Sequence, residues 1–309
     1  MIKILISTSS FGEYDKTLME ELKGKNLDIS LNPFGRQLTE REIKKLLKDV
    51  VGLIAGTEPL TNDVISNARN LKVISRCGIG IDNIDLEAVK KRGIKLYRTP
   101  EGPALAVAEL TLGFMLDSLR YISYLSRKIS SGRWEKKMGR LLTGKAVGII
   151  GMGTIGKKLS NLLRPFNCRI LAYDNAPDKK LAEENNFDYV DLDELLRKSD
   201  IITIHLPLSD KTIGLFDANV LSKIKDEAIL INTSRGKIVD ENVLYGALKT
   251  GKISYACLDV FREEPYNGKL KELDNVTLTC HVGAYAREVR RDMEKQAVEN
   301  LLKGLEMIE

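Results

Sequence analysis

The sequence of 309 residues predicts an α/β protein made of two doubly wound parallel sheets, each covered by helices on both faces. Three observations lead to this prediction. Short apolar runs alternate with helical patterns throughout residues 1–99. The same alternation starts again at Ala146, where a glycine-rich turn joins a strand to a helix. The length also suits two domains better than one.

Residues 1–99 show the strand–helix alternation that is typical of a parallel sheet. The expected strands are Ile2–Ser7, Leu27–Leu31, Val51–Ala55, Lys72–Arg76 and Ile94–Tyr97, and the expected helices are Tyr14–Leu22, Thr39–Asp49, Thr61–Ala68 and Leu86–Lys91. The second of these helices has the clearest start signal, because Thr39 and Glu42 have the spacing of a capping box.

A break at residues 99–103, which contains two prolines and a glycine, separates this region from the rest. A long helix, about Ala104–Ser130, is expected to follow, and its apolar residues nearly encircle its first half. That half should be buried, either in a core or at a subunit interface. The later expected elements are strands Ile201–His205, Ala228–Asn232, Tyr255–Asp259 and Val276–Thr279, and helices Ala218–Ile224, Glu241–Leu248 and Ala286–Leu305.

The stretch Ala146–Asp174 has the features of a dinucleotide-binding unit. An apolar strand ends at Gly151, and Gly151, Gly153 and Gly156 have the G-x-G-x-x-G spacing. The first glycine allows a tight turn, the second removes a side chain that would block a pyrophosphate, and the third lets the helix approach the strand. Asp174 ends the next strand, where a carboxylate can bind the adenine-side ribose and disfavour a 2′-phosphate. The stretch therefore predicts a Rossmann-like domain that binds NAD rather than NADP.

Composition excludes several other classes of protein. The apolar content is 43%, but no apolar run is long enough to cross a membrane. The start, Met1–Ile6, has the pattern of a strand rather than a signal peptide. Four scattered cysteines without a C-x-x-C motif favour a cytoplasmic protein without disulfides or a metal site. The net charge is +5, and the lysines and arginines are interleaved with acidic residues, which predicts no nucleic-acid partner. A small positive net charge suits a small acidic substrate.

Three polar segments follow expected strands of the second half, and their chemistry is that of hydride transfer to a 2-keto acid. They contribute Arg235, Glu264 and His281. Parallel strands end at one edge of a sheet, so these side chains should meet where the nicotinamide would lie. An imidazole can exchange the hydroxyl proton, a neighbouring carboxylate can orient it, and an arginine can hold the substrate carboxylate.

These segments make the sequence resemble the D-isomer-specific 2-hydroxyacid dehydrogenases. The other stretches that carry the resemblance are Gly78–Asp85, Ala108–Leu110 and His205–Leu208, together with the glycine motif and Asp174. Among these proteins, the chain is most similar to short 3-phosphoglycerate dehydrogenases without a regulatory domain. The resemblance implies a substrate domain, residues 1–99 completed by 285–309, interrupted by an NAD-binding domain, residues 100–284. It also implies a homodimer formed through the NAD-binding domains.

The resemblance also implies the roles of individual residues. Arg235 would bind and polarise the substrate, His281 would be the acid/base, and Glu264, rather than the adjacent Glu263, would be its partner. The loop Cys77-Gly78-Ile79 would offer N–H groups to the substrate carboxylate, and Arg76 matches a basic position near the substrate. The implied cofactor contacts are Gly151, Gly153, Thr154, Ile155, Gly156, Asp174, His205, Leu206, Pro207, Thr233, Ser234, Asp259 and Gly283. His205 would be a wall residue of the cofactor site rather than a catalyst.

The substrate is the least determined feature. A phosphorylated acid such as 3-phosphoglycerate needs cations beyond Arg235; Arg76, Lys136 and Lys137 are candidates, the lysines reaching across a dimer. However, Gly56 stands where phosphoglycerate enzymes often carry an arginine, and Glu101 and Pro103 replace polar residues. An unphosphorylated acid such as glycerate, glyoxylate or lactate is the alternative.

Two further alternatives remain open. NAD-sensing corepressors resemble the same family and keep its Arg, Glu and His; they carry long tails, which we do not expect here. Cys77 and Cys280 either face the substrate cleft together or are small buried apolar residues.

Overall fold

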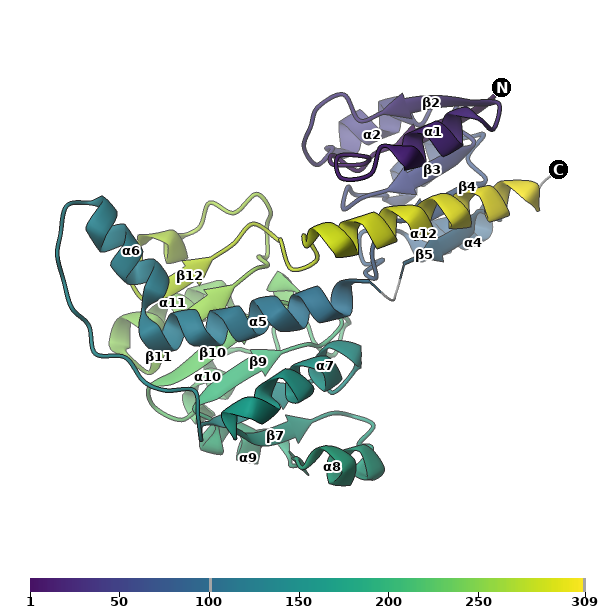
Figure 1. The fold of residues 1–309 in the computed structure, drawn as a ribbon. Helices are drawn as coiled ribbons and strands as arrows, with labels where there is room; N and C mark the ends of the chain where they lie inside the picture. Colours follow the sequence, from purple (N-terminus) through teal and green to yellow (C-terminus); the bar gives the residue numbers. More distant parts are fainter. Residues whose placement is uncertain (100–101, 308–309) are drawn as a thin grey trace. The chain divides into compact units, whose positions relative to one another are not determined.

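The computed structural model describes residues 1–99 and 102–307, and Figure 1 shows its ribbon. The chain divides into two compact units. The first unit comprises Met1–Pro103 and Ala284–Glu309, and the second comprises Ala104–Gly283. Pro100 and Glu101, at the expected domain boundary, lie outside the described residues. The second unit is thus inserted between the two segments of the first.

The first unit has a five-stranded parallel sheet in the order β2-β1-β3-β4-β5. Its strands are β1 (Ile2–Ile6), β2 (Leu27–Leu31), β3 (Gly52–Ala55), β4 (Val73–Arg76) and β5 (Lys95–Arg98), and its helices are α1 (Thr17–Lys23), α2 (Glu40–Leu46), α3 (Asn62–Asn67), α4 (Leu86–Lys91) and α12 (Arg287–Glu306). Leu5 faces the core under α2, α3 and α4, whereas its neighbours Ile4 and Ile6 face α1 and α12. Alternate residues of each strand therefore enter two separate cores.

The predicted capping box of α2 is present. The Thr39 hydroxyl accepts the N–H of Glu42, and the Glu42 carboxylate accepts the N–H of Thr39. An arginine adds to this arrangement, because Arg36 pairs with Glu42 at 2.7 Å. The hydrogen bond from Arg36 is the main cause that lowers the pKa of Glu42 to about 2.

The second unit has a seven-stranded parallel sheet in the order β12-β11-β10-β9-β6-β7-β8. Its strands are β6 (Ala146–Ile150), β7 (Arg169–Tyr173), β8 (Asp188–Tyr189), β9 (Ile201–Ile204), β10 (Ala228–Asn232), β11 (Ile253–Leu258) and β12 (Val276–Leu278). Its α-helices are α5 (Pro103–Arg120), α6 (Ile122–Ser130), α7 (Thr154–Leu163), α8 (Lys179–Asn185), α9 (Leu192–Lys198), α10 (Ala218–Lys223) and α11 (Glu241–Thr250), and short 3₁₀ helices are η1 (Arg164–Phe166), η2 (Gly236–Ile238) and η3 (Lys269–Glu272).

The chain changes direction across this sheet at β6. From β6 it continues to β7 and β8 on one side, and then returns to β9 on the other. The carboxyl ends of β6 and β9 therefore flank the switch point, where open α/β sheets bind their ligands. Ile149 faces the core under α5 and α7, and Ile150 faces the core under α9, α10 and α11. Figure 1 shows α5 lying along one face of this sheet.

The single long helix expected over Ala104–Ser130 is wrong, because the structure has two helices, α5 and α6. Tyr121 between them has a left-handed backbone, with φ of 57°. The Asp117 carboxylate accepts the N–H of Ser123 at 2.6 Å and its hydroxyl at 2.9 Å, so it caps the start of α6. The hydroxyl of Thr277 on β12 donates to the same carboxylate at 2.6 Å, so a tertiary contact helps to hold the break.

The structure has three elements between β7 and β9 that are not among those predicted from the sequence: α8, β8 and α9. Each of the two helices begins at an aspartate whose side chain accepts a backbone N–H: Asp178 for α8 and Asp191 for α9. These N-cap residues were the signal in the sequence that could have located both helices.

Candidate active site

The glycine motif forms the turn between β6 and α7. Gly151 has φ of 98°, and a Cβ there would lie 2.6 Å from the carbonyl oxygen of His205. A Cβ on Gly156 would lie 2.4 Å from the carbonyl oxygen of Gly151, so this glycine is needed for close packing of helix and strand. A Cβ on Gly153 would meet nothing within 4 Å, which leaves room for a ligand at the N-terminus of α7. This arrangement fits a dinucleotide, because N–H groups at a helix N-terminus bind phosphate.

Asp174 follows β7 and contacts the glycine loop directly. Its two carboxylate oxygens accept the N–H of Met152 at 2.8 Å and the N–H of Ala176 at 2.9 Å. The carboxylate therefore stabilises the loop, a role that the sequence does not indicate; its contact with the ribose stays a prediction.

His205 follows β9 across the switch point from Gly151. Its Nε2 lies 3.0 Å from the Thr203 hydroxyl, and its Nδ1 is buried with no hydrogen-bond partner in the described part of the chain. Burial lowers the pKa of His205 to about 3. The ring is therefore neutral at physiological pH, which agrees with a wall residue and argues against a proton-transfer role. Leu206 and Pro207 continue the segment; Leu206 is partly buried, and Pro207 is exposed.

The segment after β10 is a turn organised by Asn232. The Asn232 amide oxygen accepts from the N–H of Ser234 at 3.0 Å and from its hydroxyl at 2.8 Å, and the amide nitrogen donates to the carbonyl of Arg235 at 3.0 Å. The half-buried side chain of Arg235 donates to the carbonyl of Ser234 at 2.7 Å. Thr233 is anchored on α5 through the hydroxyl of Thr111, at 3.2 Å.

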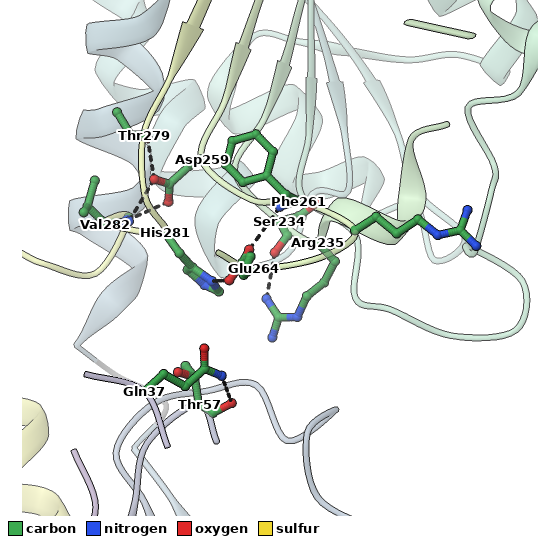
Figure 2. Close-up of polar contacts among 12 residues, drawn as sticks. Gln37, Thr57, Ser234, Arg235, Asp259, Phe261, Glu264, Thr279, His281 and Val282 are labelled. Carbon is green, nitrogen blue, oxygen red and sulfur yellow. Dashed lines mark hydrogen bonds and ion pairs between the residues drawn. The ribbon is translucent and has the colours of Figure 1, made fainter. Parts of the chain in front are cut away.

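Glu264 and His281 meet as predicted (Figure 2). The Nδ1 atom of His281 lies 2.8 Å from Oε2 of Glu264, and Oε1 of Glu264 accepts the N–H of Phe261 at 3.0 Å. Burial alone would raise the pKa of Glu264, but the hydrogen bond and charge of His281, the Phe261 N–H and the charge of Arg235 outweigh it and lower that pKa. The ionised carboxylate thus orients the imidazole through Nδ1, so Nε2 is the nitrogen that can exchange a proton with a substrate.

Asp259 determines the backbone conformation of this site. It is 1% exposed, and its carboxylate accepts the N–H of Val282 and the N–H of Gly283, both at 2.8 Å, and the hydroxyl of Thr279 at 2.5 Å. Its carbonyl oxygen accepts the N–H of His281 at 2.8 Å. His281 has φ of 56°, a left-handed conformation that is unusual for a residue with a side chain and is enriched at functional sites. The sequence predicts Asp259 beside the cofactor but does not indicate these contacts.

In the first unit, β4 leads into the loop that was expected to bind a carboxylate. Two of its three predicted N–H donors are already hydrogen-bonded: Cys77 to the carbonyl of Ala55 at 2.9 Å, and Gly78 to the Thr99 hydroxyl at 2.8 Å. For Ile79, the structure shows no such bond within the described residues. Arg76 is 8% exposed and its guanidinium donates to the carbonyls of Gly80, at 3.0 Å, and Cys77.

The cysteines have different environments. Cys77 is buried, which is one of the two expected alternatives. Cys280 is exposed, so the expectation of a buried Cys280 is wrong. Cys280 directly precedes His281 in the chain. Burial raises the pKa of Cys77 and raises that of Cys168 to about 11, so both thiols are protonated at neutral pH.

Comparisons with known proteins identify this arrangement. The model of a family described as "D-isomer specific 2-hydroxyacid dehydrogenase, NAD binding domain" matches residues 112–283, more than half of the chain. The chain belongs to the D-isomer-specific 2-hydroxyacid dehydrogenase family. The dehydrogenase is 40% identical over 276 residues to a hydroxypyruvate reductase of Thermotoga maritima, covering 87% of this chain and 89% of that protein.

Two other similar proteins extend the comparison. A D-3-phosphoglycerate dehydrogenase of Methanocaldococcus jannaschii is 39% identical over 311 residues, which cover 99% of this dehydrogenase but 58% of that longer protein. The crystal structure of the TT0316 protein of Thermus thermophilus superposes with a TM-score of 0.90 at 32% identity, covering 99% of this chain and 97% of that one. The predicted family, the fold of two parallel sheets and the cofactor NAD are confirmed.

The dehydrogenase is thus an NAD-dependent oxidoreductase that acts on D-2-hydroxy acids and their 2-keto acids. In residues 1–99 and 102–307, no helix is long and apolar enough to cross a membrane. The same residues contain no group of three His, Cys, Asp or Glu side chains placed to hold a metal ion.

Proposed function

We propose that the dehydrogenase interconverts a small, unphosphorylated D-2-hydroxy acid and its keto acid, with hydroxypyruvate as the preferred keto acid. One observation carries this proposal. The segments that follow β1 and β3 (Ser7–Ser10 and Gly56–Glu58) contain no cation. The last residue of β4 together with the loop after it (Arg76–Gly80) contains one, Arg76, and its guanidinium is bonded to the carbonyls of Cys77 and Gly80. An arginine engaged in this way supports the shape of the loop rather than a phosphate, which needs several cationic donors.

The site residues take the following roles in this proposal. Arg235 holds the substrate carboxylate and polarises the keto group, and Ile79 supplies an N–H to the same carboxylate. When bound, the nicotinamide supplies or accepts the hydride. During reduction, Nε2 of His281 donates the proton to the developing alkoxide, and Glu264 stabilises the imidazolium through Nδ1. During oxidation, the same nitrogen takes the proton back.

The deciding experiment compares kcat/KM for NADH oxidation with hydroxypyruvate, 3-phosphohydroxypyruvate, glyoxylate and pyruvate. We expect hydroxypyruvate to exceed its phosphorylated form by tenfold or more. A preference of tenfold or more for the phosphorylated acid would contradict the proposal.

3-Phosphoglycerate, the substrate that the sequence resemblance favours, is the second candidate. The observation in its favour is that Arg76 is a cation at the carboxyl edge of the first unit's sheet. If this candidate is right, Arg76→Ala should remove most of the advantage of 3-phosphohydroxypyruvate while the smaller keto acids lose less. If Arg76 only supports the loop, all four keto acids should lose kcat/KM by similar factors.

We also propose that the enzyme is a homodimer. The segment after α6 and the outer side of α6 expose large apolar side chains: Trp134 is 86%, Met138 92%, Ile129 60% and Ile122 57% exposed. The segment is nevertheless anchored on its own subunit, because the Tyr124 hydroxyl bonds to Glu135 at 2.6 Å. An apolar surface on an ordered segment suits a second copy of the chain. Sedimentation analysis should give a dimer, and Met138→Lys should weaken it; a wild-type monomer would contradict the proposal.

The rival function is an NAD(H)-sensing binding protein. Arg235, Glu264 and His281 do not separate the two functions, because the corepressors keep these residue types; the similarity to a hydroxypyruvate reductase and to a D-3-phosphoglycerate dehydrogenase favours an enzyme. Turnover of any of the four keto acids supports the enzyme. Tight NADH binding without turnover of a wide set of 2-keto acids would favour the sensor.

A further inference from the structure

The segment that carries Glu264 has little burial to hold it in place. It follows Phe261, and residues 262–265 are all exposed. The ring of Phe261 is 7% exposed and stacks on the ring of Tyr266, with the centroids 4.1 Å apart. These rings anchor the two ends of residues 262–265, but not the backbone between them. The position of the Glu264 carboxylate therefore depends on the hydrogen bonds that this exposed segment makes.

Glu241 provides a hydrogen bond to the exposed segment from another element. Its Oε1 accepts the N–H of Arg262 at 2.7 Å, whereas the next two N–H groups have no acceptor in the part of the chain that the structure describes. The carboxylate of Glu264 turns back to accept the N–H of Phe261 at 3.0 Å and lies 2.8 Å from Nδ1 of His281 (Figure 2). The bond made by Glu241 is thus only two residues along the chain from the side chain that contacts the imidazole.

Glu241 itself lies on a well-anchored element. It is the first residue of α11, and the carboxylate of Asp240 before it accepts two N–H groups of the first turn, at 2.9 and 3.2 Å. The N–H of Asp240 donates to the carbonyl of the fully buried Phe216 at 3.1 Å. The acceptor that holds Arg262 therefore belongs to a capped helix that is joined to the core of the second unit.

A second contact holds the same backbone against the segment that carries Arg235. Gly236 directly follows that arginine, and a Cβ at this position would overlap the carbonyl group of Phe261. The two backbones are thus in contact, which only glycine allows. Residues 236–241 therefore hold two successive positions, Phe261 by packing and Arg262 by a hydrogen bond.

We propose that Glu241 is a positioning residue for proton transfer. It fixes the backbone at Arg262, and thereby keeps the Glu264 carboxylate in the place from which it orients His281. A carboxylate that accepts an N–H forms a charge-assisted bond, which is stronger than a neutral one. Without this bond, the exposed segment populates other conformations, and a smaller fraction of the molecules has the imidazole held through Nδ1. This inference rests on the proposed roles of Glu264 and His281.

The first test separates the length of the Glu241 side chain from its charge. Glu241→Gln keeps the length and an acceptor oxygen, whereas Glu241→Asp keeps the charge at the N-terminus of α11 but is shorter by one C–C bond, about 1.5 Å. We expect Glu241→Asp to lower kcat by about tenfold, the value of about one hydrogen bond, and Glu241→Gln by less than about threefold. If the charge merely stabilised the helix, the order would be reversed. The reverse order, or equal kcat in both variants, would overturn the inference.

The same measurements show how the loss divides between kcat and KM. In Glu241→Asp, KM for the keto acid should change by less than about threefold, because Arg235 still holds the substrate carboxylate and the lost orientation affects the proton in the transition state. A loss confined to KM would contradict the inference. NADH binding and the midpoint of urea unfolding report that each variant is folded.

A double-mutant cycle tests whether Glu241 acts through Glu264. In the Glu264→Ala background, Glu241→Asp should lower kcat by less than about threefold more, because no carboxylate is left to be positioned. A further loss of about tenfold in this background would mean that Glu241 acts on another group, and it would overturn the inference.

Glu87 provides a matched control, because it is an exposed glutamate in the first turn of α4 and makes no hydrogen bond with the described residues. Glu87→Asp should leave kcat within about threefold of wild type, and a loss equal to that of Glu241→Asp would contradict the inference. All variants are assayed with NADH and whichever of the four keto acids the wild type reduces fastest. If Glu264→Ala leaves kcat unchanged, the proposed mechanism fails and the inference fails with it. If Glu264→Ala lowers kcat but Glu241→Asp does not, only the inference fails.

Discussion

Asp259 accepts hydrogen bonds from three consecutive backbone N–H groups that begin at His281: its carbonyl accepts that of His281, and its carboxylate accepts those of the next two residues. This relationship holds His281 at φ of 56°, where a Cβ costs about 1–2 kcal/mol. The imidazole is thus aimed at Glu264 by a backbone conformation that the buried carboxylate imposes.

We therefore expect His281→Gly to be more stable than His281→Ala. Glycine relieves the left-handed strain but increases the entropy of the unfolded chain, so the net difference should be about 0.5–1 kcal/mol. Urea unfolding of both variants measures it. Val282, which is not in the left-handed region, provides the control: Val282→Gly should be less stable than Val282→Ala. The same order at both positions would contradict the role of strain at His281.

The pair of His281 and Glu264 should act as one unit in catalysis. His281→Ala should lower kcat by about 10²–10⁴-fold, the usual contribution of a general acid. Glu264→Gln removes the carboxylate that holds the imidazole through Nδ1, so this variant should also lower kcat. A double variant about as slow as the worse single variant would support the coupling; unaltered kcat in His281→Ala would refute the mechanism.

Asp174 should affect both cofactor choice and loop stability. Asp174→Ala removes the acceptor for the N–H of Met152, so NADH binding should weaken by about tenfold or more. It also removes the charge that repels a 2′-phosphate, so the preference for NADH over NADPH should decrease. Asp174→Asn keeps an acceptor, so NADH binding should weaken less while the preference narrows similarly. Fluorescence titration with both cofactors measures these changes. A wild type that prefers NADPH would show that the assignment is wrong.

His205 should make the protein less stable in acid. Its pKa is about 3 in the folded protein and about 6.5 when unfolded, so below pH 6.5 the unfolded chain binds the extra proton. Stability is fully present above pH 6.5 and is lost as pH falls, by at most about 2 kcal/mol at pH 5. His205→Gln should reduce the loss of unfolding free energy between pH 7.5 and 5.0 by up to that amount. An equal loss in the variant would contradict neutral burial of the ring.

The features that sequence reasoning found depend on local patterns. The glycine spacing of Gly151–Gly156 and the capping box at Thr39 involve residues close in sequence, and both have the predicted geometry. The meeting of His281 and Glu264 follows from the rule that parallel strands end at one edge. These features require no knowledge of side chains that approach from distant parts of the chain.

The features that it missed depend on tertiary contacts. Tyr121 is left-handed without being glycine, and the break it creates is held by Thr277, which is far away in sequence. The burial of Glu58 depends on Ser7 at the end of another strand. Similarly, the folding of Arg76 onto its own loop requires the loop conformation to be known.

The position of α12 has a consequence for synthesis of the protein in the cell. This helix lies in the first unit, where the Ser75 hydroxyl donates to the Ala297 carbonyl at 2.8 Å and the side chain of Leu301 fills the place beside Gly52. The strands of the first unit are therefore synthesised before the helix that covers one face of their sheet. The inserted unit is contiguous and can fold in the meantime. The first unit is therefore completed only after the whole of the second unit has been synthesised, and until then one apolar face of its sheet lacks the cover of α12.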